Sequence, residues 1–180
     1  MIGLTGPNAA GKGEVAAYLQ RLGFTVHSLS DIVREEAAAE GLAPEREHLI
    51  RTGNRLRREG GAGELARRIL PRLGPRAVVD SIRNPAEVEV LRALPHFLLL
   101  GLKASLESRF ERCLRRGRPG DPATLEEFRE RERQENTADP EAQQLDATMR
   151  LADRFVDNDG GLGELEQSVD HALQNHDAKI

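Results

Sequence analysis

A short glycine-rich segment near the N-terminus constrains the fold of this chain more than any other feature. Residues 6–12 fit the pattern G-x-x-x-x-G-K. An apolar stretch at residues 2–5 predicts a strand before the segment, and helical apolar spacing at residues 12–22 predicts a helix after it. Glycines let successive backbone N–H groups turn toward an anion, and the helix N-terminus adds its positive dipole end. The segment therefore predicts a phosphate-binding loop; the alternative is a glycine-rich turn with a solvated lysine.

The loop also predicts which residues hold a nucleotide. Lys12 places a flexible ammonium group where it can reach the β- and γ-phosphates. The next position, normally Ser or Thr, is Gly13, so the hydroxyl that usually ligates Mg²⁺ is missing. We expect this loss to weaken activity and not nucleotide binding, and we expect Glu14 to be a first-turn acid favoured by the helix dipole. The predicted nucleotide-binding residues of the loop are Gly6, Pro7, Asn8, Ala9, Ala10, Gly11, Lys12, Gly13 and Glu14.

Further along the chain, short apolar runs alternate with amphipathic stretches. The runs predict strands at residues 24–27, 77–80, 97–102 and 154–157. The amphipathic stretches predict helices at residues 30–40, 44–58, 63–73, 85–94, 106–116, 124–135 and 162–173, the first capped by Ser30 or Asp31. This alternation predicts a three-layer α/β fold, with about five parallel strands and helices on both faces of the sheet. The length of 180 residues suits a single domain spanning residues 1–180.

Composition argues against several other classes of protein. The aromatic share is 3% and there is no Trp, which opposes modules that stack bases on rings. A net charge of −4 opposes a general duplex-DNA binder. The sole cysteine, Cys113, excludes an internal disulfide. No apolar run approaches the roughly 18–20 residues of a membrane span, and the N-terminus does not resemble a signal peptide, so we expect a cytoplasmic protein without a membrane partner.

A second set of candidate residues follows the apolar run at residues 77–80. The run ends in Asp80, and a strand that ends in aspartate behind a phosphate-binding loop predicts a carboxylate that holds Mg²⁺. Arg83 is expected near the phosphates, because α/β proteins bind ligands at the carboxyl ends of their strands. The alternative for Arg83 is a surface ion pair with Glu87, one helical turn further on.

Asp31 and Arg34 are candidates for binding a phosphoryl acceptor. The two residues are three positions apart, so they share one face of the predicted helix. There Arg34 would clamp a phosphate, and Asp31 would take a proton or hold water ligands of Mg²⁺. The alternative is a capping aspartate with a solvated arginine.

An arginine-rich stretch from Arg109 to Arg133 predicts a mobile cover over the site, at about residues 112–135. Two charged helices flank a break at residues 117–122 that is rich in Gly and Pro. A phosphoryl group in transfer needs charge neutralisation and exclusion of water, which arginines on a closing cover can supply. We expect Arg112, Arg116 and Arg118 to reach the phosphates. The alternative is a pair of solvated helices with i,i+3 and i,i+4 ion pairs.

Together these residues resemble the nucleoside-monophosphate-kinase superfamily of P-loop kinases, in particular its dephospho-CoA-kinase-like and adenylate-kinase-related branches. The resemblance covers nearly the whole chain and rests on residues 6–12, 30–34, 80–88, 109–118 and 152–160. The last stretch is similar to an A-D-x-x-I-x-N-x-G pattern near the adenine site of dephospho-CoA kinases. This similarity implies that Asn158 and Gly160 contact the nucleotide.

The resemblance implies ATP and Mg²⁺ as cofactors and phosphoryl transfer to a small nucleotide-like acceptor, either dephospho-CoA or a nucleoside monophosphate. Helices at about residues 30–73 would bind the acceptor. The catalytic candidates are Lys12, Asp31, Arg34, Arg83, Arg116 and Arg118, with Asp80 on the metal and Asp31 as the base for a hydroxyl acceptor.

Two other functions stay open. One is a regulatory P-loop protein that binds nucleotide without useful transfer, which Gly13 favours. The other is an RNA- or DNA-binding protein that uses the arginine-rich stretch, which the acidic net charge and the scarcity of aromatic residues oppose.

Overall fold

The computed structural model describes residues 1–118 and 120–174, with a five-stranded sheet at its centre. The strands lie in the order β2-β3-β1-β4-β5, and the neighbouring strands are parallel. Their bounds are Ile2–Thr5 for β1, Thr25–Ser28 for β2, Ala77–Asp80 for β3, Leu98–Lys103 for β4 and Arg154–Asp157 for β5. The predicted parallel α/β sheet is confirmed.

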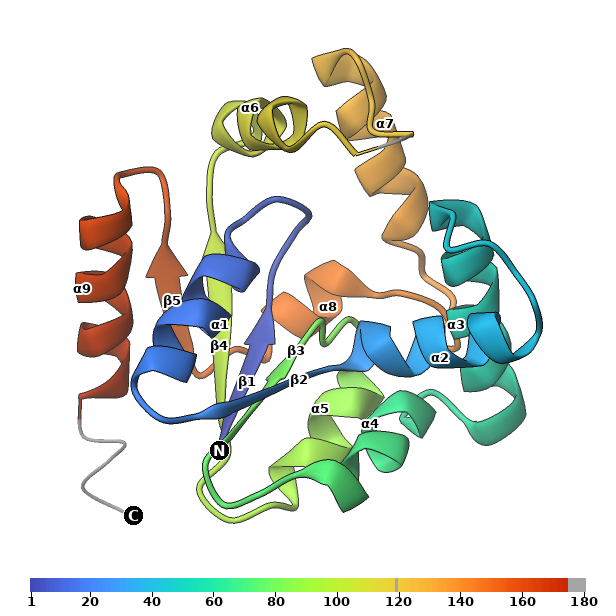
Figure 1. Cartoon of the computed structure of the whole chain (residues 1–180), viewed down its shortest axis with the longest axis horizontal. Helices are drawn as coiled ribbons and strands as arrows, with labels where there is room; N and C mark the ends of the chain where they lie inside the picture. The colour runs from blue at the N-terminus through green and yellow to red at the C-terminus, as the bar shows by residue number, and fades with distance from the viewer. Residues whose placement is uncertain (119, 175–180) are drawn as a thin grey trace.

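Helices cover both faces of the sheet, as Figure 1 shows. On one face, α1 (Lys12–Arg21) and α9 (Leu162–Leu173) pack in a cluster with Leu4 and Leu100. On the other face, α2 (Leu29–Ala39), α3 (Arg46–Gly60), α4 (Glu64–Ile69) and α5 (Pro85–Arg92) pack in a cluster with Val79 and Leu99. The short α8 (Leu145–Met149) contacts α5 and β1. The three-layer arrangement is therefore confirmed. No helix within the described residues is long and apolar enough to cross a membrane.

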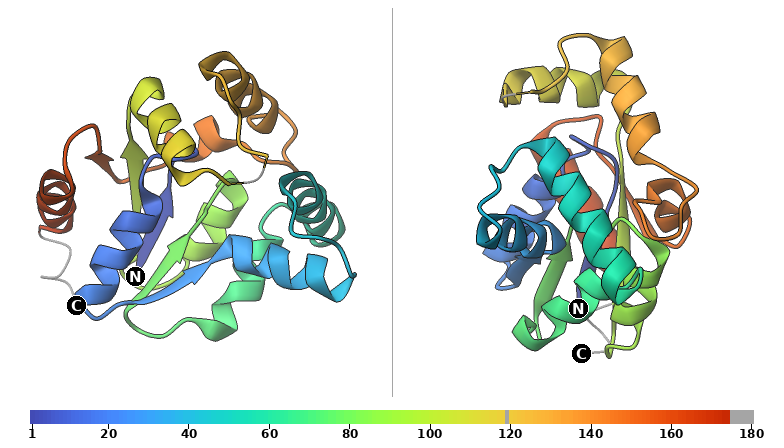
Figure 2. Two further views of the ribbon diagram at one scale, coloured as in Figure 1. Left: turned by 45° about the horizontal axis from the view of Figure 1, so that its top comes forward. Right: turned by 90° about the vertical axis from the view of Figure 1, so that its right-hand side faces the viewer.

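Two more helices lie beyond the carboxyl ends of the strands. They are α6 (Leu106–Arg116) and α7 (Leu125–Glu135), and Figures 1 and 2 show them standing off the edge of the sheet. The loop that follows β1 opens at the same edge. The topology thus brings the glycine-rich loop and the arginine-rich stretch to one end of the molecule.

The inner strand β4, between β1 and β5, shows why the sheet is covered on both faces. Leu98, Leu100 and Leu102 belong to the cluster on one face, whereas Leu99 belongs to the cluster on the other. Gly101 leaves space for a close approach, because a Cβ there would lie 2.9 Å from Ala152 and Phe155. A continuous apolar run is what a parallel strand between two helical layers requires.

Three local predictions differ from the structure. Helix α2 is capped by Ser28, whose side chain accepts from the backbone N–H of Ser30, and not by Ser30 or Asp31. The helix predicted at residues 63–73 divides into α4 and a short 3₁₀ turn, Leu70–Arg72, because Pro71 lacks an N–H for the helical pattern. Helix α8 was not predicted, since its five residues are too few for an amphipathic period.

Candidate functional site

The loop between β1 and α1 has a backbone that suits glycine at two positions. Gly6 and Gly11 have φ angles of +150° and +98°, in the range that L side chains rarely adopt. Side chains would also collide there: a Cβ on Gly6 would lie 2.8 Å from the carbonyl oxygen of Leu102, and one on Gly11 would lie 2.0 Å from Nδ2 of Asn158. Both glycines of the G-x-x-x-x-G-K pattern are therefore required by the local structure.

Lys12, the first residue of α1, folds back over this loop. Its Nζ donates hydrogen bonds to the carbonyl oxygens of Gly6 (2.7 Å) and Pro7 (2.9 Å). Burial, and then repulsion from Arg83, lowers the pKa of Lys12 from 10.5 to about 8. An anion bound in the loop would favour the charged form, so the ammonium group is well placed to respond to a phosphate.

Other charged side chains gather around Lys12. The carboxylate of Asp80, at the end of β3, accepts hydrogen bonds from the backbone N (2.5 Å) and Oγ (3.3 Å) of Ser81. The charges of Arg83 and of Arg109 on α6 lower the pKa of Lys12, whereas the charge of Asp80 raises it. The carboxyl edge of the sheet therefore gathers three cations and the carboxylate of Asp80.

Arg83 extends toward the segment that follows α7. Its Nη1 donates to Oε1 of Gln143 (2.9 Å) and lies 3.8 Å from Oε2 of Glu135. Burial lowers the pKa of the Arg83 guanidinium from its ordinary value. The Glu87 carboxylate instead accepts from the backbone N–H of Arg83 and pairs with Arg57. The alternative of a surface ion pair between Arg83 and Glu87 is therefore wrong.

A cavity of about 500 Å³ lies beside the glycine-rich loop. Pro7 and Asn8 of the loop line it, and Leu145 and Met149 of α8 contribute apolar surface. Its other lining residues are Arg83, Arg109, Arg129, Glu132, Arg133, Glu135, Asn136, Gln143 and Asp146. Guanidinium groups next to an apolar surface suit an organic molecule that carries phosphates.

The predicted cover contacts the glycine-rich loop directly. Arg116 binds the Asp121 carboxylate with Nη2 (2.9 Å to Oδ1), and its Nη1 lies 3.4 Å from Oδ1 of Asn8. Arg109 pairs with Glu132 of α7, and its Nη1 lies 3.4 Å from the carbonyl oxygen of Asn8. Helix α6 therefore contacts the loop that would hold the phosphates, and α7 is linked to it through the pairing of Glu132 with Arg109.

Arg112 and Asn158 meet behind the glycine-rich loop. Asn158 donates from Nδ2 to the carbonyl oxygen of Ala10 (2.9 Å), and Arg112 donates to the carbonyl oxygen of Asn158 (2.6 Å). Nη1 of Arg112 is buried without a hydrogen-bond partner among the described residues. In the structure, Asn158 supports the loop backbone, and Arg112 keeps one donor unused.

Asp31 and Arg34 lie apart from this group. They form an exposed ion pair with each other, and Arg34 also donates to Oγ of Ser30 (3.0 Å). Neither residue lines the 500 Å³ cavity. In the structure the guanidinium group of Arg34 turns to its own helix, and a role for the two residues in binding the acceptor stays a prediction.

The remaining predicted residues have varied surroundings. Gly13 and Glu14 are exposed, and a Cβ on Gly13 would meet no atom within 4 Å. A Cβ on Gly160 would lie 1.6 Å from Oε2 of the exposed Glu164 side chain, which would have to move to admit it. Arg118 is exposed, and its backbone N–H donates to Asp121. Pro119, within the predicted cover, lies outside the described residues.

The described residues contain no group of three or more His, Cys, Asp or Glu side chains that could hold a metal ion by themselves. Asp80 and Glu132 are the two carboxylates whose charges raise the pKa of Lys12. Glu132 pairs with Arg109, so Asp80 is the one that could contribute a ligand. Mg²⁺ typically binds through one or two carboxylates, substrate phosphates and water. The donor set thus fits a magnesium ion that arrives with a nucleotide, and not a preformed metal site.

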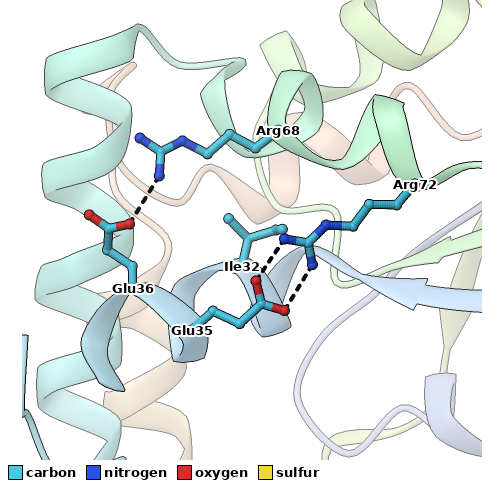
Figure 3. A pocket seen from close by; sticks show the side chains of 5 residues that line it. All are labelled: Ile32, Glu35, Glu36, Arg68 and Arg72. Atoms are coloured by element: carbon cyan, nitrogen blue, oxygen red, sulfur yellow. Dashed lines mark hydrogen bonds and ion pairs between the residues drawn. The ribbon is translucent and has the colours of Figure 1, made fainter. Parts of the chain in front are cut away.

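A second cavity, of about 350 Å³, lies between α2 on one side and α4 with its following 3₁₀ turn on the other. Figure 3 shows that its charges neutralise one another: Glu35 binds Arg72 through both carboxylate oxygens, and Glu36 pairs with Arg68. Ile32 is the apolar residue of its lining. Unlike the first cavity, it has no lining residue from the glycine-rich loop, so it is a weaker candidate for binding the phosphates of a nucleotide.

Several residues at the site were not singled out from the sequence. Arg109 belonged to the arginine-rich stretch but had no feature that separated it from its neighbours. Gln143 lies in a polar segment without a motif, and the pairing of Arg57 with Glu87 joins residues 30 positions apart. Spacing along one helix cannot reveal such contacts between elements.

A family model described as an AAA domain matches residues 5–129. A UPF0200 protein from Hyperthermus butylicus is 34% identical to this chain over 174 residues, which cover 94% of this chain and 91% of that protein.

Solved structures show the same fold. TT1252 from Thermus thermophilus is similar with a TM-score of 0.61 and 26% identity, over 96% of this chain and 95% of that chain. A shikimate kinase from Aquifex aeolicus is similar with a TM-score of 0.58 and 15% identity, over 99% of both chains. The architecture is therefore that of P-loop kinases.

Proposed function

The chain belongs to the UPF0200 family and has a P-loop kinase-like fold, and from this premise we propose that it transfers the γ-phosphoryl group of ATP to a small nucleotide-like acceptor. The observation that carries this proposal is the convergence of Lys12, Asp80, Arg83 and Arg109 beside a cavity at the carboxyl edge of the sheet. Phosphoryl transfer depends mainly on positioning and charge neutralisation, and these four side chains supply both.

Each residue has a proposed task. The backbone amides of residues 6–12 and the ammonium of Lys12 bind the β- and γ-phosphates. Asp80 holds Mg²⁺, whose charge neutralises the phosphate oxygens when the ion is bound. Arg83 positions the acceptor, and the cover residues Arg109 and Arg116 exclude water and stabilise charge on the transferring group. Arg112, with one unused buried donor, contributes to nucleotide binding.

We favour a nucleoside monophosphate as the acceptor over dephospho-CoA. A monophosphate attacks through an oxygen that is already ionised at pH 7, so no base is needed. Dephospho-CoA attacks through a ribose hydroxyl, which benefits from a general base. The carboxylate proposed as that base, Asp31, does not line the cavity and pairs with Arg34.

The test is ADP release by the pure protein with Mg·ATP and a panel of nucleoside monophosphates, deoxynucleoside monophosphates and dephospho-CoA. We expect at least one monophosphate to stimulate ADP release, and Lys12→Ala to abolish the stimulation. Stimulation by dephospho-CoA alone would contradict the acceptor assignment. ATP binding without stimulation by any acceptor would support a regulatory P-loop protein, which Gly13 also favours.

A further inference from the structure

A buried ion pair lies next to the site without touching the cavity. Arg57 on α3 and Glu87 on α5 have side chains that are 4% and 0% exposed. Nε and Nη2 of Arg57 both donate to Oε1 of Glu87, at 3.0 Å and 2.8 Å. This is a specific contact between a predicted acceptor-binding helix and the helix that follows β3.

The other oxygen of Glu87 holds the backbone that carries Arg83. Oε2 accepts from the backbone N–H of Arg83 (2.8 Å) and of Asn84 (3.1 Å). Both carboxylate oxygens are therefore satisfied, one from α3 and one from the turn after β3. Because Arg57 fixes the carboxylate, it also fixes the backbone from which the Arg83 side chain extends.

The opposite side of the same turn is bound to the segment that follows α7. Nδ2 of Asn84 donates to the carbonyl oxygens of Pro140 and Ala142, each at 2.8 Å. The backbone N–H of Gln144 donates to the carbonyl oxygen of Arg83 at 2.8 Å. Residues 83 and 84 are thus linked by hydrogen bonds to α3, through Glu87, and to residues 140–144 after the cover.

We infer that Arg57 and Glu87 are positioning residues that hold Arg83 in the geometry for phosphoryl transfer to the acceptor. This inference rests on the proposed function. Stability does not by itself explain such a pair, since replacing a buried ion pair with apolar residues of similar volume often leaves the protein equally stable. The pair does what an apolar contact cannot: it anchors two backbone N–H groups beside the cavity. Arg57 thereby acts through Arg83 and does not itself contact substrate.

The test is a double variant, Arg57→Met with Glu87→Gln, which leaves no unpaired buried charge and keeps a residue suited to the capping box of α5. The matched control carries the same substitutions in an exposed ion pair on α3, Arg51→Met with Glu47→Gln. For the test variant we expect a cooperative thermal transition, ATP affinity within about twofold of wild type, and kcat/KM for the acceptor lowered at least about tenfold. The control should match wild type in all three.

Hydrogen exchange provides a readout that does not depend on transfer. The amides of residues 83 and 84 should exchange at least about tenfold faster in the test variant than in the control. If wild type transfers no phosphoryl group, the proposed function fails, while unchanged exchange would still overturn the positioning of this turn by the pair. With an active wild type, unchanged kcat/KM would overturn the inference.

A further variant with one substitution covers the case in which the double variant does not fold. Arg57→Lys keeps the buried charge but loses the two-point contact with Oε1. It should fold and show faster exchange at residues 83 and 84, with a smaller loss of kcat/KM than the double variant. Wild-type exchange and wild-type kcat/KM in this variant would overturn the inference.

Discussion

Individual side chains decide whether the loop after β1 can bind a phosphate, and Lys12 has the clearest signature. Its role was predicted from the G-x-x-x-x-G-K pattern, because consecutive residues specify both the loop backbone and the position of the lysine. Its lowered pKa was not predictable, because it depends on burial and on Arg83, which reaches the site from the turn after β3. Asp31 shows the opposite case: its spacing from Arg34 suggested a site, but the two side chains satisfy each other.

The pKa of Lys12 makes ATP binding depend on pH. The folded-state value of about 8 lies below the ordinary value, so the free protein loses this proton as the pH rises through about 8. Bound phosphates need the charged form, and binding above this pH must take up a proton. Between pH 7.5 and 9.5 we expect ATP affinity to fall by roughly tenfold or more, measured by titration calorimetry. Lys12→Ala should bind weakly at both pH values, and a pH-independent wild type would contradict the role of this charge.

Gly13→Ser should restore a hydroxyl at the position where the loop lacks one. A Cβ at this exposed position would meet no atom within 4 Å, so a small side chain has room. We expect a lower Mg²⁺ concentration for half-maximal activity. Gly13→Ala is the control, because it also favours the helix, by up to about 1 kcal/mol, without adding a hydroxyl. Equal Mg²⁺ requirements in wild type and both variants would show that water or another group fills this ligand position.

Asp31→Asn distinguishes the two classes of acceptor. Since Asp31 is exposed, paired with Arg34 and absent from the cavity lining, we expect kcat to fall by less than about tenfold. A catalytic base would give a loss of about 10²-fold or more. Steady-state kinetics with ATP affinity measured in parallel decides the matter, and a loss of that size would move the assignment to a hydroxyl acceptor.

Helices and strands were predictable where the apolar period was long and the ends were marked. The bounds of β3, α6 and α9 agree with the prediction, because Asp80, Gly117 and Gly161 punctuate them. Helix α8 and the 3₁₀ turn at Leu70–Arg72 were missed, since neither contains two full turns of pattern. The contacts of the cover with Asn8 were beyond sequence reasoning, because they depend on how α6 and α7 stand over the sheet edge.

Because of those contacts, we expect loss of the Arg116 side chain to lower kcat more than loss of the neighbouring Arg115 side chain. Arg116→Ala removes the link between Asp121 in the cover and Asn8 in the loop, and leaves a half-buried carboxylate without its partner. We expect kcat to fall at least about tenfold with a smaller change in ATP affinity. Arg115→Ala, an exposed position on the same helix, serves as the control. Equal kcat in the two variants would show that the cover does not act through Arg116.

Charged side chains are distributed unevenly over the molecule, and cations gather at the proposed site. Although the net charge is −4, Lys12, Arg83 and Arg109 converge at one edge of the sheet. The central strand β1 leads into the phosphate-binding loop at the carboxyl edge, where parallel α/β sheets bind their ligands. The fold therefore followed from the alternation of apolar and amphipathic stretches, and the proposed site location follows from one motif. The acceptor did not, because its cavity is built from α7, α8 and segments that lack motifs.

The most direct test of the proposed nucleotide site is calorimetric titration of Mg·ATP into wild type and Lys12→Ala. Lys12 begins α1, and its ammonium group bonds to backbone carbonyls of the loop, so its loss should leave the fold intact. We expect an unchanged thermal transition and an ATP affinity at least about tenfold weaker in the variant. Equal affinity in the two proteins would contradict the assignment of residues 6–12 as the nucleotide-binding loop.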